Sequence, residues 1–140
     1  MAEGTATTPI VFTSNQDAGS RSYGDWGGII ILGNATVNKV DPVIEGGPSS
    51  TYGGSDDADN SGIFKYVRIE FPGIAFQPDK EINGFTLGGV GSGTEISHVQ
   101  VSFSGDDSYE WFGGKVNASH LIAFRGWDDD FDTDYGYRGI

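Results

Sequence analysis

The residues best suited to chemistry form an acidic run near the C-terminal end of the sequence. Five aspartates fall within seven residues there: Asp128, Asp129, Asp130, Asp132 and Asp134. Carboxylate oxygens are the ligands that Ca²⁺ prefers, and this ion takes about six to eight oxygens. The run therefore predicts a Ca²⁺ site. The alternative is a solvated acidic turn, in which the carboxylates accept hydrogen bonds from nearby backbone N–H groups.

A second acidic group precedes the first at a fixed offset. Asp106 and Asp107 lie 22 residues before Asp128 and Asp129. If each group belongs to one turn of a repeating β-structure, equivalent carboxylates lie about 4.8 Å apart. Like charges at that distance repel one another, and a cation relieves the repulsion. The predicted Ca²⁺ ligands are Asp106, Glu110, Asp128, Asp130, Asp132 and Asp134.

Aromatic residues accompany both acidic groups, and this combination is typical of carbohydrate binding. A sugar ring has an apolar face and a hydroxyl edge, so aromatic side chains and carboxylates bind it together. The predicted glycan-binding residues are Tyr109, Trp111, Trp127, Tyr135 and Tyr137. The alternative is that about half of the aromatic residues in this region face the interior of the fold.

Paired carboxylates also permit glycoside cleavage, with one group acting as acid and the other as base. Asp107 and Asp129 are the candidates for such a pair. A lyase would need Ca²⁺ and a basic proton acceptor, and nothing in the sequence singles out one lysine or arginine for that role. We therefore rank catalysis behind binding.

The elements that position these residues are predicted to be short strands. Apolar and polar residues alternate along the repeat, glycines interrupt them, and no segment shows helical periodicity. A fixed repeat of this kind is typical of a solenoid, in which equivalent residues stack in columns. We expect Val67, Val99 and Leu121 to form one inner column, and His98 and His120 to stack as a polar pair. A neighbouring column would contain Ile69, Val101 and Ala123.

The sequence thus predicts an all-β fold, a parallel β-helix of about six coils of about 22 residues each. The predicted strands cover residues 10–13, 26–33, 63–71, 82–90, 96–103, 109–116 and 121–124. We interpret residues 1–140 as one domain, with a long polar loop at about residues 41–62. Loops of this length commonly form binding surfaces.

The charge of the chain restricts its partners. The net charge is −12 and the sequence contains no cysteine. Nucleic acids and anionic membranes both require a basic surface, so neither is expected as a partner.

No apolar segment approaches the roughly 18 residues of a membrane span. The first residues lack the basic start and apolar core of a signal peptide.

Three phrases of the sequence resemble a family of right-handed parallel β-helix proteins from Bacteroidota and related bacteria, which are secreted or surface-anchored and often lipoproteins. The phrases are residues 24–33, 61–71 and 127–134. The resemblance implies a right-handed parallel β-helix and an extracytoplasmic location. Because members of that family are longer, it also implies that the chain is a truncated portion of a larger solenoid. It implies no established catalytic residues.

A separate short phrase, Gly105-Asp106-Asp107, resembles one element of pectin-hydrolysing β-helix enzymes. The other elements of that pattern are Asn-Thr-Asp, Gly-His-Gly and Arg-Ile-Lys, and the sequence contains none of them. We therefore predict a non-catalytic extracytoplasmic module, stabilised by Ca²⁺ and binding polysaccharide or cell-surface glycan. The alternatives are a polysaccharide lyase or glycoside hydrolase, and a purely structural solenoid that self-associates end to end.

Overall fold

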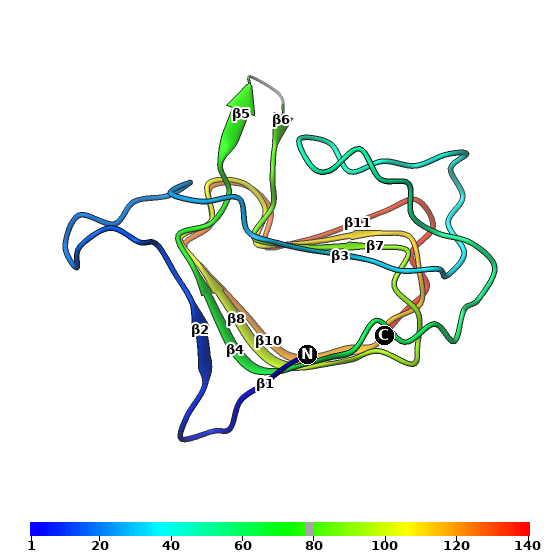
Figure 1. Cartoon of the computed structure of the whole chain (residues 1–140), viewed down its shortest axis with the longest axis horizontal. Helices are drawn as coiled ribbons and strands as arrows, with labels where there is room; N and C mark the ends of the chain where they lie inside the picture. The colour runs from blue at the N-terminus through cyan, green and yellow to red at the C-terminus, as the bar shows by residue number, and fades with distance from the viewer. Residues whose placement is uncertain (78–79) are drawn as a thin grey trace.

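Two stacks of parallel strands wind around a common interior in the computed structural model, which describes residues 1–77 and 80–140 (Figure 1). The first sheet contains β1 (Ala2–Glu3), β2 (Ile10–Phe12), β4 (Ile63–Glu70), β8 (Glu95–Ser102) and β10 (Ala118–Phe124). The second contains β3 (Ile29–Leu32), β7 (Phe85–Gly88), β9 (Tyr109–Phe112) and β11 (Phe131–Asp134). The chain alternates between the sheets, which confirms the predicted all-β parallel β-helix.

Equivalent residues stack in columns inside the helix, as the repeat predicts. Val67 pairs with Val99, and Val99 pairs with Leu121. The second predicted column, Ile69, Val101 and Ala123, is also in register. Tyr109 pairs with Phe131, and their rings stack with centroids 5.2 Å apart. Each coil buries its apolar face against the next coil, so the stability of the fold depends on this stacking.

The strands of the first sheet change direction at residues with a left-handed backbone. Tyr66, His98 and His120 occupy this corner in β4, β8 and β10, with φ of 50°, 54° and 55°. Phe71 and Phe103 occupy the next corner, with φ of 61° and 59°. Non-glycine residues rarely adopt this conformation, and here it lets one residue turn the chain. The resulting cross-section is roughly triangular (Figure 1).

The number of coils differs from the prediction. In the described residues each sheet has four levels instead of about six. The first sheet has the order β1 or β2, β4, β8, β10, and the second has the order β3, β7, β9, β11. Only the last level of each sheet keeps the 22-residue spacing, seen between Val99 and Leu121 in the first sheet and between Tyr109 and Phe131 in the second. The earlier levels are longer because segments leave the coil between β3 and β4 and between β4 and β7.

Both of these segments lie over the outer face of the second sheet. The first segment contains the predicted loop at residues 41–62, and its Ile44 and Tyr52 bury themselves against Phe112 of β9. The second contains an antiparallel hairpin of β5 (Ala75–Gln77) and β6 (Lys80–Glu81). Figure 1 shows the hairpin and the loop projecting on the same side of the molecule. They enclose the candidate site described below.

Part of the acidic run 128–134 is a strand that the predicted strands did not include. Phe131–Asp134 forms β11, in register with β9, so the acidic run 128–134 is part turn and part strand. The alternation of its carboxylates is the period of two of a strand, in which successive side chains point to opposite faces. Among the described residues no helix is long and apolar enough to cross a membrane.

Candidate functional site

The candidate site is built on the outer face of the second sheet. Tyr109 and Trp111 of β9 are buried in the interior, so the alternation of the strand directs Glu110 and Phe112 outward. Glu110 lies in register between Thr86 of β7 and Asp132 of β11. A carboxylate is thereby fixed at the centre of the sheet by strand pairing on both sides.

Neighbouring segments form a cleft of about 230 Å³ over Glu110. The hairpin side contributes Glu81 and Asn83, and the long loop contributes Glu45. The turn before β9 contributes two more carboxylates, and the end of β11 contributes another. The full lining is Glu45, Glu81, Asn83, Asp106, Asp107, Glu110, Phe112, Asp134 and Tyr135. Six of these residues are acidic, so the site is a strongly negative acidic cleft.

The carboxylates at the acidic cleft fall into two overlapping groups. Asp106, Asp107 and Asp128 form one group, and Asp107, Glu110 and Asp132 form the other, with one oxygen of each residue within 4.8 Å of the others. Asp107 belongs to both groups. Its Oδ1 also accepts a hydrogen bond from the backbone N–H of Asp129 at 2.9 Å. The turn that follows the first sheet therefore holds Asp107 in place.

Burial and mutual repulsion raise the pKa values of three of these carboxyl groups. Burial, followed by the charge of Asp107, raises the pKa of Glu110 to about 8. Burial also raises the pKa of Asp107 to about 7, and the nearby charge of Asp106 adds to the effect. The pKa of Asp106 is raised to about 6 by burial and by Glu81. The side-chain amide of Asn83 donates a hydrogen bond to Glu110, and only 8% of Glu110 is exposed.

The oxygen chemistry of the acidic cleft fits a hard divalent cation. Carboxylate oxygens line it from several sides, and the sequence has no cysteine to supply a softer ligand. Ca²⁺ accepts six to eight such oxygens at 2.3–2.6 Å in flexible geometry. A bound cation would also offset the burial and the mutual repulsion that together raise the three pKa values. Asp107, as the shared member, would be the central ligand.

The structure brings together most of the predicted metal ligands. Asp106, Glu110, Asp128 and Asp132 belong to the two carboxylate groups. Asp134 lines the acidic cleft. Asp130 is exposed and belongs to neither group, because it lies in the turn before β11 and strand pairing does not direct it over the sheet.

The two predicted catalytic residues are placed differently. Asp107 lies in the cleft, whereas Asp129 is exposed and contributes its backbone N–H rather than its carboxylate to the contact with Asp107.

The five predicted glycan-binding aromatics also separate. Tyr109 and Trp111 are buried core residues, which removes their ring faces from the surface. Tyr137 packs on Trp111 and donates a hydrogen bond to the carbonyl of Val116 at 2.7 Å. Trp127 is 71% exposed, outside the cleft lining, and Tyr135 lines the acidic cleft itself.

The predicted site residues do not include three polar residues of the acidic cleft. Glu45 comes from the long loop, and Glu81 and Asn83 come from the segment that contains the hairpin. Neither segment belongs to the 22-residue repeat, so no register could place them. Phe112 and Tyr135 also line an adjoining hollow of about 350 Å³, which includes Lys39. The acidic cleft is thus continuous with a more apolar surface.

The fold and this site define a parallel β-helix protein with an acidic cleft on the outer face of one sheet. Over residues 1–140 the chain matches the family model described as a pectate-lyase-like β-helix domain. The chain therefore belongs to the pectate-lyase-like β-helix family, which confirms the predicted resemblance at the level of a parallel β-helix family. No curated protein and no solved structure matches the chain.

Proposed function

We propose that the protein is an extracytoplasmic binding module whose acidic cleft takes up Ca²⁺ and, with it, a polysaccharide. The observation that carries the proposal is the pair of carboxylate groups that share Asp107 beside the nearly buried Glu110. Carboxylates enclosed in this way are costly without a positive partner. Because Ca²⁺ takes about six to eight oxygens and each carboxylate group offers three residues, a cation bound there would also coordinate hydroxyl or carboxylate oxygens of a sugar.

The surroundings of the acidic cleft support a carbohydrate as the second ligand. Tyr135 and Phe112 lie at the boundary between the cleft and the adjoining hollow. Lys39 donates a hydrogen bond to the Tyr135 hydroxyl at 2.5 Å. Aromatic rings beside polar groups match a sugar ring, which is apolar on one face and hydroxylated at its edge. The family description, pectate-lyase-like, is in keeping with this ligand class.

Calorimetric titration tests this proposal in two steps. Ca²⁺ is titrated into the protein after treatment with EDTA, and polysaccharides are then titrated in the presence and absence of Ca²⁺. We expect binding of Ca²⁺ and a polysaccharide signal that requires it. Asp107→Asn should weaken Ca²⁺ binding at least tenfold, while Asp130→Asn, outside both groups, should not change it. Failure of Ca²⁺ to bind would refute the proposal.

A second candidate function, carbohydrate cleavage, is favoured by the raised pKa values. A carboxyl group with a pKa near 7 is protonated often enough at neutral pH to act as a general acid. Asp107 and Glu110 have this property. Release of reducing ends, or of unsaturated products, from polysaccharides would establish this function.

Light scattering in the same samples tests the third alternative, end-to-end self-association.

A further inference from the structure

A second hollow lies on the outside of the first sheet, away from the acidic cleft. It has a volume of about 450 Å³ and follows the corner at which β4, β8 and β10 change direction. We call it the corner groove, lined by Thr5, Ala6, Pro9, Tyr66, Val67, Arg68, His98, Val99, Gln100, His120, Leu121 and Ile122. Cavities that bind small molecules usually measure about 300–1,000 Å³, so the corner groove has the size of a ligand site.

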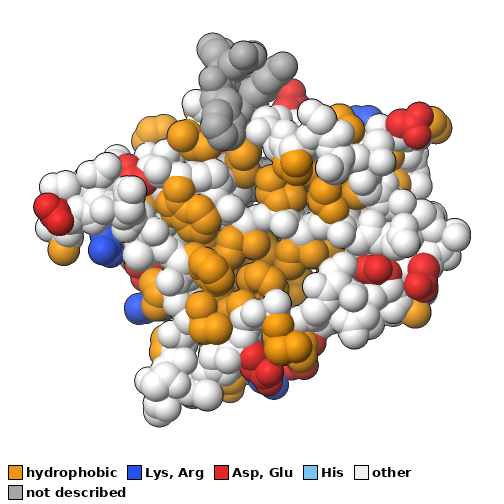
Figure 2. Space-filling model, viewed as in Figure 1, with side chains coloured by type: hydrophobic (Ala, Val, Ile, Leu, Met, Phe, Trp, Pro, Cys, Tyr) orange, Lys and Arg blue, Asp and Glu red, His pale blue; other side chains and the backbone are white. Residues whose placement is uncertain are grey.

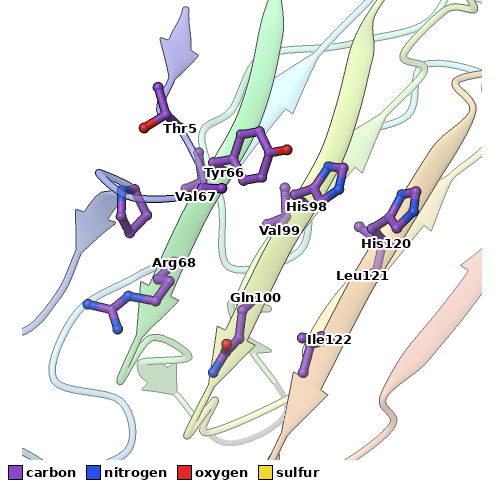
Figure 3. Close-up of a pocket in the computed structure, with 12 residues that line it drawn as sticks. Thr5, Tyr66, Val67, Arg68, His98, Val99, Gln100, His120, Leu121 and Ile122 are labelled. Carbon is purple, nitrogen blue, oxygen red and sulfur yellow. The ribbon is translucent and has the colours of Figure 1, made fainter.

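One side of the corner groove is a row of three rings (Figure 3). Tyr66 stacks on His98 with centroids 4.4 Å apart, and His98 stacks on His120 at 4.2 Å. This confirms the predicted stacking of the two histidines. Because Tyr66 and His120 cover both faces of the His98 ring, only the edge of that ring remains available to a ligand. Ring edges carry partial positive charge and favour edge-to-face contact with another ring.

The other side of the corner groove presents hydrogen-bond donors. Arg68 and Gln100 lie in a second row with Ile122, and Val67, Val99 and Leu121 separate this row from the rings (Figure 3). The Nε2 of Gln100 also donates a hydrogen bond to Ser102 Oγ at 2.9 Å. Arg68 pairs with Glu70 through Nε at 3.6 Å, and no described residue accepts a hydrogen bond from its two Nη atoms. The Nδ1 atom of His98 is buried and has no hydrogen-bond partner among the described residues.

The end of the corner groove is closed by a segment specific to the first level of the helix. Glu3 pairs with Lys65 and Ile10 pairs with Val67, so residues 4–9 stand where later levels have a single corner residue. Thr5, Ala6 and Pro9 of this segment line the groove. The sequence pattern of the repeat contains no signal for such an enclosure.

The charge of the corner groove contrasts with that of the whole protein. The chain has a net charge of −12, yet the lining contains no aspartate or glutamate, and its one charged residue is Arg68, whose Nε pairs with Glu70 outside the lining. This local composition is complementary to an anion. Apolar side chains and rings make up much of the rest of the lining, so this part of the groove suits an apolar ring on the ligand.

We propose that the corner groove binds a small organic anion that carries a ring. Arg68 and Gln100 receive the oxyanion, because a guanidinium forms strong, charge-assisted hydrogen bonds with such groups. The ring of the ligand lies against the edges of Tyr66, His98 and His120. This site is independent of the acidic cleft, which lies on the other sheet.

Nuclear magnetic resonance titration with benzoate tests the proposal. Benzoate should shift the ring signals of Tyr66, His98 and His120 in a saturable manner. Benzyl alcohol, which has the same ring without the charge, should bind at least about tenfold more weakly. Inorganic phosphate, which has charge without a ring, should also bind at least about tenfold more weakly. Equal affinity for either control compound would overturn the proposal, as would shifts confined to other parts of the protein.

Matched variants locate the charge contact. Arg68→Gln should weaken benzoate binding about tenfold, the change expected for one lost charge-assisted hydrogen bond. Arg138→Gln removes the same charge at a distant site, where Arg138 pairs with Asp57, and should leave binding unchanged. Glu110→Gln in the acidic cleft should also have no effect. Unchanged binding by a folded Arg68→Gln variant would contradict the assignment.

Discussion

The buried carboxylate Glu110 makes the stability of the protein depend on pH in an unusual direction. Its pKa is raised from 4.5 in the unfolded chain to about 8 in the folded protein, mainly by burial. The folded state therefore holds a proton that the unfolded state has already lost in this range. The contribution of Glu110 to the free energy of unfolding should be fully present below about pH 4.5 and should be lost as the pH rises through about 8.

The size of this effect follows from the difference between the two pKa values. One pH unit of difference corresponds to about 1.4 kcal/mol. For Glu110 alone, the change in unfolding free energy between about pH 5 and about pH 8 is at most about 3.5 kcal/mol. Coupling to Asp107 and residual solvent screening reduce the expected value to about 2 to 3 kcal/mol. For a chain of this length the melting temperature would change by about 6 to 9 °C.

The perturbation that isolates this contribution is Glu110→Gln. Glutamine has the shape of glutamate and can still accept the hydrogen bond from Asn83, but it has no charge to bury. In EDTA at about pH 8 the variant should be more stable than the wild type by about 2 to 3 kcal/mol. At about pH 5 the difference should be below about 1 kcal/mol, because Glu110 is then protonated in the folded protein.

The assay is thermal unfolding followed by circular dichroism at both pH values, in EDTA and in millimolar Ca²⁺. Ca²⁺ should stabilise the wild type at about pH 8, by about 2.7 kcal/mol at a hundredfold excess over Kd, and much less at about pH 5. Glu3→Gln, at an exposed position in β1, is the matched control. Asp25 and Asp57 have lowered pKa values and titrate below this range. A wild type whose stability does not fall between these pH values, or a destabilised Glu110→Gln, would refute the reasoning.

Three further predictions concern the site and the fold. Asp132→Asn should weaken Ca²⁺ binding at least about tenfold in calorimetry, whereas Asp130→Asn should change the affinity by less than about twofold. Equal effects of the two substitutions would contradict the grouping of the carboxylates. Leu87→Ala should lower the free energy of unfolding, measured in urea, by about 2 to 5 kcal/mol, because this side chain is fully buried. A loss below about 1 kcal/mol would argue against the stacked core. Gly28→Ala should lower the free energy of unfolding by about 1 to 3 kcal/mol in the same assay. Gly28 has φ of 105°, and a Cβ there would meet the carbonyl oxygen of Asn83. An unchanged unfolding midpoint would disprove the strain.

The interior of the helix was predictable from the sequence in detail. Val67, Val99 and Leu121 form the expected column, and His98 stacks on His120. These predictions succeed because alternation along a strand and a constant repeat length are local properties of the chain. Because paired strands lie about 4.8 Å apart, residues separated by one repeat in the sequence become direct neighbours on adjacent strands. The hydrophobic patch in the middle of the end view reflects this stacking of apolar side chains (Figure 2).

The acidic cleft was predictable only in part. The repeat indicated that Glu110 and Asp132 would be neighbours, and the structure confirms their register. The sequence did not distinguish an aspartate in the turn from one on the strand, so Asp130 was included among the ligands. It also gave no rule for the inward direction of Tyr109 and Trp111, because either face of a strand can be the buried one.

The local pattern of the chain specifies the fold class, the stacking partners inside the coil and the acidic character of one edge. The number of levels, the residues over the second sheet, and the enclosure of the acidic cleft and the corner groove depend on long-range packing. Glu45, Glu81 and residues 4–9 all belong to segments outside the repeat. Such segments are positioned by packing against distant strands, for example Ile44 against Phe112, and not by their own periodicity. The regular part of the chain therefore specifies the scaffold, and the irregular part, placed by long-range contacts, completes the sites.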